Sequence, residues 1–396
     1  MKIKFLALAA AGALSAAAHA QSNVTMYGVL DADMNWTDSG FGRKMAVGTG
    51  GLSATRLGFR GSEDLGSGLS AVFTLEAGFS MDTQSMGAGA PANAGAGNAG
   101  NFGGINNTVA STGGAPGTGS QIFSRQGLVG LQGNWGSVHF GRLLTGSYVG
   151  ETSVVDPVGG GLYAGITATG SQGLASRVNN GVTYKTPNMN GFSGWFTYSP
   201  GSENNLSGPT AVGATTTNDK AGRGYDLAFF YSNGPFNGVL SAWNWNATSW
   251  VTAGETDLAQ KRGALLGANY DFKMVKLHLG LISAKIDGGN YQNVTKSFSK
   301  TGTTFVSAVV PLGAGSIVLN RIALDDKSLL NKDFTAWSLG YLYDFSKRTT
   351  LYADYGKVSN NANSSQALLD GGDTVGTPSV AGASQTGFMV GMRHKF

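Results

Sequence analysis

The sequence predicts an all-β fold, a sixteen-stranded antiparallel transmembrane β-barrel with short turns at one end and long loops at the other. Three observations predict it. Apolar and polar side chains alternate along many short segments, short and long connections alternate between those segments, and the chain ends in an aromatic residue on an apolar strand face. Alternation with a period of two is typical of a strand with one apolar face, and in a membrane barrel that face contacts lipid.

The alternation is clear at 70–79, where every second residue is apolar and most of the residues between them are polar. The same pattern recurs at 225–232, 275–282 and 335–343, whereas few windows show the 3.6-residue period of a helix. Sixteen such segments can be counted along the chain. Their approximate positions are 24–34, 52–61, 69–80, 122–133, 137–145, 177–185, 191–199, 224–232, 236–246, 262–271, 275–285, 300–310, 316–324, 333–343, 349–358 and 385–396.

The connections between these segments are alternately short and long. Short ones such as 134–136, 233–235 and 311–315 are rich in turn-forming residues. Because membrane barrels have short periplasmic turns and long extracellular loops, the alternation predicts that the two ends of the barrel face different compartments. The long connections are 35–51, 81–121, 146–176, 200–223, 247–261, 286–299, 325–332 and 359–384.

A soluble β-sandwich or an adhesin stalk would also show alternating side chains. The outer face of a sandwich is highly charged, whereas the apolar face here carries tyrosine and tryptophan near the strand ends. Aromatic residues in these places are typical of the girdles at the two membrane interfaces, which favours the barrel. The aromatic pairs are Trp243 with Trp245, Tyr225 with Tyr231, and Tyr341 with Tyr343.

The two ends of the chain fit export to an outer membrane. Residues 1–20 predict a signal peptide, because Lys2 and Lys4 precede an apolar run that is too short to span a membrane and that leads to a small-x-small cleavage pattern. The barrel domain is then 21–396. A terminal aromatic on the apolar face is expected of the assembly signal of such barrels, so Phe396 is assigned that role. In the last strand one face holds Phe388, Val390, Met392 and Phe396, and the other holds Met389, Arg393 and Lys395.

The composition excludes several classes of protein. The chain has 396 residues, of which 63 are glycine and none is cysteine, so disulfide scaffolds, cysteine-ligated zinc, iron–sulfur clusters and thiol catalysis are excluded. Charged residues make up 13%, about half of the ~25% usual in proteins. The formal net charge of +4 includes two lysines of the signal peptide, and the remainder is too small to indicate a nucleic-acid partner.

Several segments resemble the general, non-specific trimeric porins of Gram-negative bacteria, in particular the group found in Neisseria-like and Comamonas-like β-proteobacteria. The resemblance implies a homotrimer of water-filled barrels that pass small hydrophilic solutes, with outer-membrane lipid, lipopolysaccharide and the barrel-assembly machinery as partners and no cofactor. It also implies that the third long loop, about 145–176, folds inward and narrows the pore. The matching segments are VTMYGVLDADM (24–34), ATRLGFRGSEDLGSGLSAVFTLEAGF (54–79), SRQGLVGLQGNWGSVHFGR (124–142), SRVNNGVTYKTPNMNGFSGWFTYS (176–199) and GFMVGMRHKF (387–396).

Three arginines are the main candidates for the pore constriction. Arg56 is on the face opposite to the apolar Leu57, and Arg125 is on the face opposite to Leu128. The alternation therefore predicts that both arginines face the lumen, and it predicts the same for Arg177. All three match wall arginines of the anion-selective members of the group. Two weaker candidates lie near strand ends and are Arg60 and Arg142.

Carboxylates supply the opposite charge. Glu151 and Asp156 fall in the third loop, and the functional hypothesis is a field across the pore between wall arginines and loop carboxylates. The alternative is that each charge is merely solvated. Two unit charges 4 Å apart in water interact by only about 1 kcal/mol, so we expect a modest, salt-dependent anion preference. Further acidic residues with lumenal parity are Glu76, Asp31 and Asp33.

No catalytic or metal site is expected. The histidines of the barrel domain, His139, His278 and His394, lie far apart in the sequence and lack the spacing of metal ligands, and no nucleophile elbow is present. A glycine pattern at 95–100 resembles a dinucleotide fingerprint, but no strand leads into it. A passive channel is therefore favoured over a substrate-specific channel, a barrel enzyme or an adhesin that would use the 81–121 loop.

Overall fold

The computed structural model describes residues 23–40, 42–82, 122–166, 174–201, 222–246, 260–287, 299–370, 373–374 and 380–396. The predicted signal peptide and the glycine-rich stretch 86–119 lie outside the described residues. Among the helices of the described ranges, none has the length and apolar character needed to cross a membrane.

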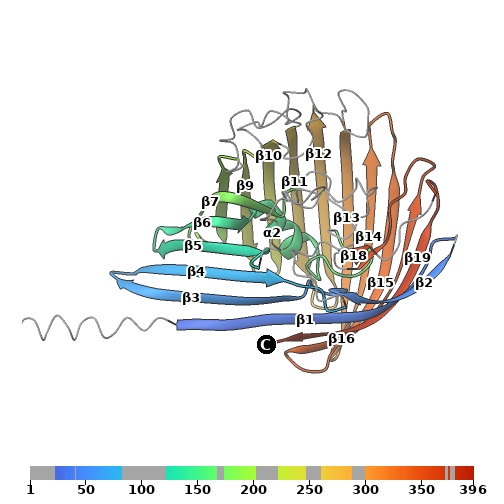
Figure 1. Cartoon of the computed structure of the whole chain (residues 1–396), viewed down its shortest axis with the longest axis horizontal. Coiled ribbons are helices and arrows are strands. Elements are labelled where there is room, and N and C mark those ends of the chain that lie inside the picture. Colours follow the sequence, from blue (N-terminus) through green and yellow to red (C-terminus); the bar gives the residue numbers. More distant parts are fainter. Residues whose placement is uncertain are drawn as a thin grey trace, which may run out of the picture.

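One antiparallel sheet dominates the described part of the chain (Figure 1). A short helix α2 (Gly146–Gly150) runs directly into a π-helical turn η2 (Glu151–Val155), and β17 (Leu369–Asp370) pairs with β18 (Asp373–Thr374) away from the main sheet. The strands of the main sheet are β1 (Asn23–Asp38), β2 (Arg43–Thr49), β3 (Arg56–Gly66), β4 (Leu69–Gly78), β5 (Gln126–Gly133), β6 (Gly136–Leu144), β7 (Arg177–Lys185), β8 (Phe192–Ser199), β9 (Gly224–Asn233), β10 (Phe236–Asn246), β11 (Gln260–Asp271), β12 (Lys276–Asp287), β13 (Ser299–Leu312), β14 (Gly315–Asp326), β15 (Phe334–Asp344), β16 (Thr349–Asn360) and β19 (Gln385–Lys395).

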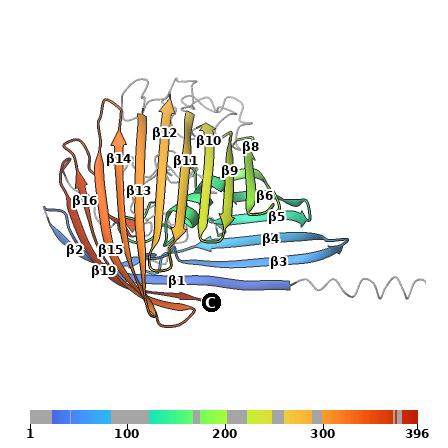
Figure 2. The same ribbon diagram turned by 180° about the vertical axis from the view of Figure 1, so that it is seen from behind.

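The sheet closes into a barrel because the first strand pairs with the last. Val29 of β1 is opposite Lys395 of β19, and the two strands run antiparallel (Figures 1 and 2). The 17 strands of the sheet correspond to sixteen positions in the wall, because β2 and β3 both pair with β1, one with each half of it. This confirms the predicted sixteen-stranded antiparallel barrel.

The short turns, the start of β1 and the C-terminus lie at the same end of the barrel (Figure 1). Tight turns follow β3, β9 and β13, with Gly68, Gly234 and Gly313 at positive φ, which glycine adopts without steric cost. Gly28 and Phe396 exchange two backbone hydrogen bonds of 3.1 Å at this end, and Figure 1 shows the C-terminus beside β1. At the opposite end the third connection leaves the wall after β6. The prediction of a long connection at 35–51 is wrong, because β1 extends to Asp38 and β2 covers Arg43–Thr49.

The predicted alternation of faces is confirmed along most of the wall. On β12, Leu277, Leu279 and Leu281 are exposed on the outside, while His278 and Ile282 are buried on the inside. The last strand divides as predicted, with one side exposed and Met389 buried. The exposed residues of its outer side are Phe388, Val390, Met392 and Phe396.

The prediction that Trp243 and Trp245 belong to an aromatic girdle is wrong. The two residues are only 2% and 1% exposed, because they share the inner parity of β10 with Val239. Tyr225 and Tyr341, by contrast, are exposed on the outer face as predicted. The inner wall of this barrel therefore includes large apolar side chains that a purely water-lined interior would not have.

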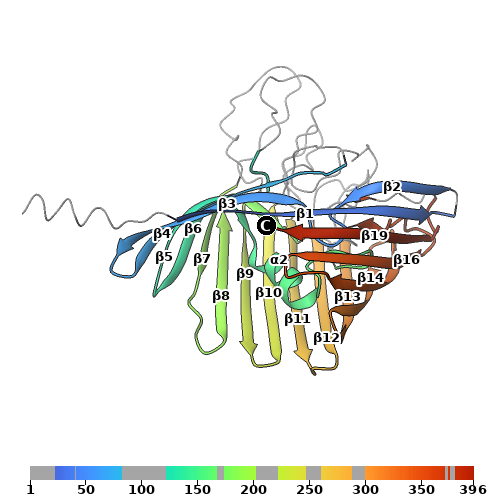
Figure 3. The same cartoon turned by 90° about the horizontal axis from the view of Figure 1, so that it is seen from below.

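The third long connection covers these inner apolar side chains. Its residues Val155, Leu162 and Ile166 are fully buried in one cluster with wall residues such as Phe305 and Ile322. Figure 3 shows α2, at the start of this connection, within the ring of strands. The barrel thus has an internal core, and its position fixes where the connection lies.

Candidate pore constriction

The base of the third connection is fastened by Thr145. Its hydroxyl accepts a hydrogen bond from the backbone N–H of Tyr148 at 3.2 Å, which caps α2, and donates to the backbone oxygen of Ala175 at 2.5 Å. The backbone N–H of Thr145 also donates to Ser176 at 3.3 Å. These bonds join the residues where the connection leaves the wall after β6 to those where it returns before β7.

Polar side chains of the wall hold the first part of the connection. Asp226 of β9 accepts a hydrogen bond from the backbone N–H of Ser147 at 3.1 Å. The backbone oxygen of Val154 accepts from Nδ2 of Asn269 at 2.7 Å and lies 3.0 Å from Nδ1 of His278. His278, for which the sequence favours a structural role over metal binding, therefore contacts the backbone of the connection.

A second set of contacts holds the far part of the connection on the opposite side of the lumen. The backbone N–H of Tyr163 donates to Oδ2 of Asp354 at 2.8 Å, and its phenol donates to Oδ1 of Asn35 at 2.6 Å. The backbone N–H of Leu162 donates to the oxygen of Gly51 at 2.7 Å. The connection is therefore bonded to both β9–β12 and the β1–β16 side of the wall.

The predicted loop carboxylate Asp156 faces the backbone of its own loop. It is 2% exposed, and its two oxygens accept hydrogen bonds from the N–H groups of Val158, Gly159 and Ile166 at 2.8–3.0 Å. Burial raises the pKa of the Asp156 carboxyl, and the backbone donors act in the opposite direction. Glu151 is also buried, in η2. The part that these two residues play in a field across the pore stays a prediction.

Arg56, Arg125 and Glu76 come together on the inner wall. Nε of Arg125 lies 2.6 Å from Oε1 of Glu76, and Nε of Arg56 lies 3.9 Å from Oε2. The phenol of Tyr27 donates to the same Oε2 at 2.9 Å, and the guanidinium of Arg60 lies 5.3 Å from the centre of the Tyr27 ring. One carboxylate is thus shared by two guanidinium groups.

Two further arginines extend this group. Nε of Arg142 donates to the backbone oxygen of Ser124 at 2.6 Å, and its Nη1 donates to Asn179. The guanidinium of Arg177 lies 5.6 Å from the centre of the Tyr148 ring in α2, so it is positioned against the start of the third connection. Arg125 is within electrostatic range of all three other members. We call Arg56, Arg125, Arg142 and Arg177 the arginine cluster.

Arg125 reaches the interior by a different route from the one that the alternation suggested. Val129 and Leu131 are the outward residues of β5, being 59% and 42% exposed, whereas Leu128 packs toward the interior cluster. Simple alternation from these residues would place Arg125 outside. It faces inward because β5 begins only at Gln126, and the chain before it turns toward Glu76.

The predicted lumenal carboxylates Asp31 and Asp33 are buried in the wall. Oδ2 of Asp31 accepts from the N–H groups of Leu52 and Ser53 at 3.2 and 2.7 Å, and its Oδ1 accepts from the phenol of Tyr352 at 2.6 Å. Asp33 accepts from the side-chain amide of Asn35. Asp31 therefore fixes the bend between β2 and β3, and it is not grouped with the arginine cluster.

The sequence analysis did not identify the residues that hold the third connection. Asp226 carried a signal, because it is a single charge between the apolar Tyr225 and Leu227. Asp354 and Tyr163 carried no such signal in the sequence, because the hydrogen bond between them joins positions that are 191 residues apart. Within the described ranges no group of three or more histidine or acidic residues could hold a metal ion.

The comparisons with known proteins agree with this architecture. The model of the Gram-negative porin family matches residues 7–363. An outer membrane porin protein of Bordetella pertussis and outer membrane porin protein 32 of Delftia acidovorans are each 31% identical to the chain, over 100% of it and 100% of their own length.

Solved structures show the same fold. The anion-selective porin from Comamonas acidovorans has a TM-score of 0.71 at 28% identity, over 95% of this chain and 100% of that one. OmpT of Vibrio cholerae, solved in a trimer form, has a TM-score of 0.63 at 14% identity, over 95% of this chain and 99% of that one. The chain therefore belongs to the Gram-negative porin family.

Proposed function

We propose that the protein is an outer-membrane porin, a water-filled channel through which small hydrophilic solutes and ions diffuse passively, with a modest preference for anions. The closed sixteen-stranded wall, the family and the full-length porin relatives support the channel. Barrels of this size leave an aqueous lumen unless something fills it, and here an inward connection narrows the lumen.

The arginine cluster is the single observation that carries the anion preference. Four guanidinium groups belong to the cluster and two of them, those of Arg56 and Arg125, share its one carboxylate, Glu76. The wall carboxylates Asp31, Asp226 and Asp354 are instead hydrogen-bonded to backbone groups. Rings of fixed charge select ions by sign. One relative with the same fold is an anion-selective porin, which agrees with this proposal.

Glu151 and Asp156 are the proposed negative side of the field across the pore. Both carboxylates are buried in the third connection, where the lower dielectric screens a charge less than water does. Because Asp156 also holds the loop backbone, Glu151→Gln is the better test of the field. We expect the variant to shift the selectivity of the channel while its conductance stays close to that of the wild type.

The experiment that tests the function is the reversal potential across a planar bilayer in a KCl gradient. The wild type should show stepwise conductance and a potential of the sign expected for chloride preference. Arg56→Glu should move the potential toward cations, because Arg56 is the most exposed of the guanidinium groups paired with Glu76. Lys347→Glu, in the exposed turn between β15 and β16, is the matched control and should have little effect. A clear cation preference in the wild type would contradict the proposal.

The finer features that we propose are a homotrimer, recognition of Phe396 by the barrel-assembly machinery, contact with lipopolysaccharide and cleavage of the signal peptide after residue 20. OmpT, a fold relative, is known in a trimer form, which supports the first. Chemical cross-linking of the purified protein would test it, and a ladder that stops at three chains is expected. We also propose that the barrel has no enzymatic activity, for which hydrolysis assays with lipid and peptide substrates are the check.

A further inference from the structure

Two aromatic side chains face the lumen near the short-turn end of the barrel. On β8, Phe196 is exposed on the outside, so its neighbour Trp195 is on the inner face. On β9, Phe229 is exposed on the outside, and Phe230 packs against the interior cluster. The ring centres of Trp195 and Phe230 lie 6.0 Å apart, and both side chains are partly exposed. An aromatic surface is therefore open to the lumen here.

Lys185, the last residue of β7, places its ammonium over one of these rings. Lys185 is directly opposite Trp195 in the sheet, and its Nζ lies 3.5 Å from the centre of the indole ring. Figure 3 shows β7, β8 and β9 side by side, so the lysine and the two aromatic residues come from adjacent strands. A lysine at a strand end is long enough to reach bulk water, and the cation–π contact holds it on the wall instead.

The positive charge of Lys185 is not neutralised by a neighbouring side chain. Lys185 has no ion pair with any carboxylate of the described ranges. Ser137 of β6 is directly opposite it, and the partly exposed His139 of the same strand is within its electrostatic range. An anion that approaches the ammonium would thus find a hydroxyl and an imidazole beside it.

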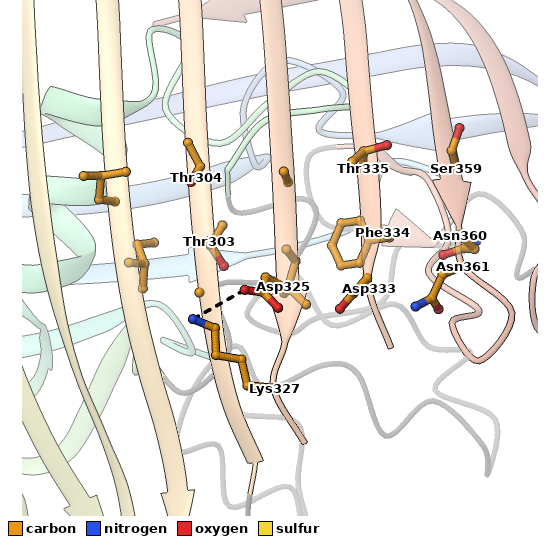
Figure 4. Close-up of a pocket in the computed structure, with 15 residues that line it drawn as sticks. Thr303, Thr304, Asp325, Lys327, Asp333, Phe334, Thr335, Ser359, Asn360 and Asn361 are labelled. Carbon is orange, nitrogen blue, oxygen red and sulfur yellow. Dashed lines mark ion pairs between the residues drawn. The ribbon is translucent and has the colours of Figure 1, made fainter. Parts of the chain in front are cut away.

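A cavity at the long-loop end lacks this combination. It has a volume of about 700 Å³ and is lined by Lys327, whose Nζ lies 3.4 Å from Oδ2 of Asp325 (Figure 4). Its described lining includes one aromatic residue, Phe334, which is 4% exposed. The cation there is already paired and the ring is covered, whereas at the short-turn end the cation is unpaired and the rings are open.

The group around Lys185 is separate from the arginine cluster. Lys185 and Arg177 lie at opposite ends of β7, which has nine residues. At about 3.3 Å per residue, a strand of this length spans about 26 Å. Screening at physiological salt acts over about 8 Å, so the two positions are electrostatically independent. A solute that crosses the barrel would meet them one after the other.

We propose that Lys185, Trp195 and Phe230 form a binding site in the lumen for aromatic carboxylates, with the carboxylate on the ammonium and the ring against the two aromatic side chains. The inference deepens the proposed channel and rests on it, because the site opens into the lumen. Lysine and carboxylate form charge-assisted hydrogen bonds, and aromatic rings attract one another in offset and edge-to-face arrangements. The site therefore retains an aromatic anion longer than an aliphatic anion of the same charge.

The test is the block of single-channel current by benzoate, in planar bilayers at a fixed KCl concentration. Acetate has the charge without the ring, and benzamide has the ring without the charge. Benzoate should interrupt the wild-type current at a concentration about tenfold lower than acetate does, because a ring contact of this kind is worth about that factor in affinity. Equal block by benzoate and acetate would overturn the proposal, and so would equal block by benzoate and benzamide.

Variants of the chain locate the site. Lys185→Gln and Trp195→Leu should each remove most of the difference between benzoate and acetate. Trp195→Phe keeps an aromatic ring and should preserve much of that difference, which separates loss of the ring from altered packing. Lys327→Gln removes one positive charge at the long-loop end and is the matched control, which should behave as the wild type does. A difference that survives both Lys185→Gln and Trp195→Leu would overturn the assignment.

A second measurement separates failure of the site from failure of the channel. Saturation-transfer NMR of benzoate with the folded full-length barrel in detergent micelles detects binding without ion flow, and Lys185→Gln should weaken the signal. A barrel that binds benzoate but carries no current would contradict the proposed channel. A barrel that conducts and shows no preference for benzoate over acetate in either measurement would contradict the site alone.

Discussion

The phenol of Tyr163, on the connection inside the barrel, donates a 2.6 Å hydrogen bond to the side-chain oxygen of Asn35 on the first strand. Both residues are buried, and the bond joins the connection to β1, the strand that pairs with β3 of the arginine cluster. The width left for solutes therefore depends on a contact between two segments that are 128 residues apart in the chain.

Tyr163→Phe should loosen the connection without unfolding the barrel. Loss of one buried hydrogen bond costs about 0.5–1.5 kcal/mol, and the Asn35 amide also loses its partner there. We expect more frequent current fluctuations in single-channel recordings and an unchanged strand content by circular dichroism. Tyr184→Phe removes a phenol hydrogen bond at an exposed turn, to the backbone of Trp135, and should leave the recordings unchanged. Equal noise in both variants would disprove the role of Tyr163.

Gly280→Ala should displace the third connection. A Cβ at Gly280 would overlap the side chain of Val155, and overpacking of this kind typically costs about 1–3 kcal/mol. We expect an altered unitary conductance and a lower midpoint of thermal unfolding. Gly302→Ala is the matched control, because its added methyl group points into open space on the neighbouring strand. If Gly302→Ala changed the conductance as much, internal packing would not be the cause.

The anion preference should fall as the salt concentration rises. Screening acts over about 10 Å at 0.1 M salt and about 3 Å at 1 M. The arginine cluster should therefore produce a larger selectivity ratio, taken from the reversal potential, at 0.1 M than at 1 M KCl. In Arg56→Gln the ratio should be lower at low salt and should differ little from wild type at high salt. A ratio independent of salt would point to a binding step that electrostatics does not control.

Asp156 should make the stability of the loop depend on pH. Burial raises the folded-state pKa of this carboxyl above its ordinary value of 3.8. Its contribution to stability is then fully present below 3.8 and is lost as the pH rises through the raised pKa. Asp156→Asn should abolish this part of the pH dependence and lower the free energy of unfolding by about 1–3 kcal/mol, because an amide cannot accept from all of the backbone donors. Denaturant unfolding between pH 3 and pH 8 measures both effects, and parallel curves for the two proteins would contradict the assignment.

The fold was predictable because membrane strands follow a local rule. A side chain facing lipid must be apolar, so β12 and β19 show their outer faces directly in the sequence. The rule says much less about the inner face. Trp243 and Trp245 have the composition of a lipid-facing pair, but they share the inner parity of β10 and belong to the buried cluster that includes residues of the third connection.

The candidate site was predictable in part. Arg56 and Glu76 follow from strand parity, and the structure places them together. Arg125 comes just before Gln126, the first residue of β5, so the alternation along the strand does not determine which way its side chain points. Burial of Glu151 and Asp156 depends on how the connection folds on itself, and the pairing of Tyr163 with Asp354 depends on contacts between distant segments. Neither the burial of these two carboxylates nor the pairing of Tyr163 with Asp354 leaves a local pattern in the sequence.

The apolar side chains that the inner wall buries against the third connection limit how this channel could be widened. Deleting the third connection would uncover Phe305, Ile322 and Trp245 along the lumen. Hydrophobic constrictions close pores by expelling water from them. A barrel enlarged in this way would gain cross-section and also a stretch that resists wetting, so attempts to engineer a wider conduit should replace those three side chains with hydroxyl or amide residues in the same step.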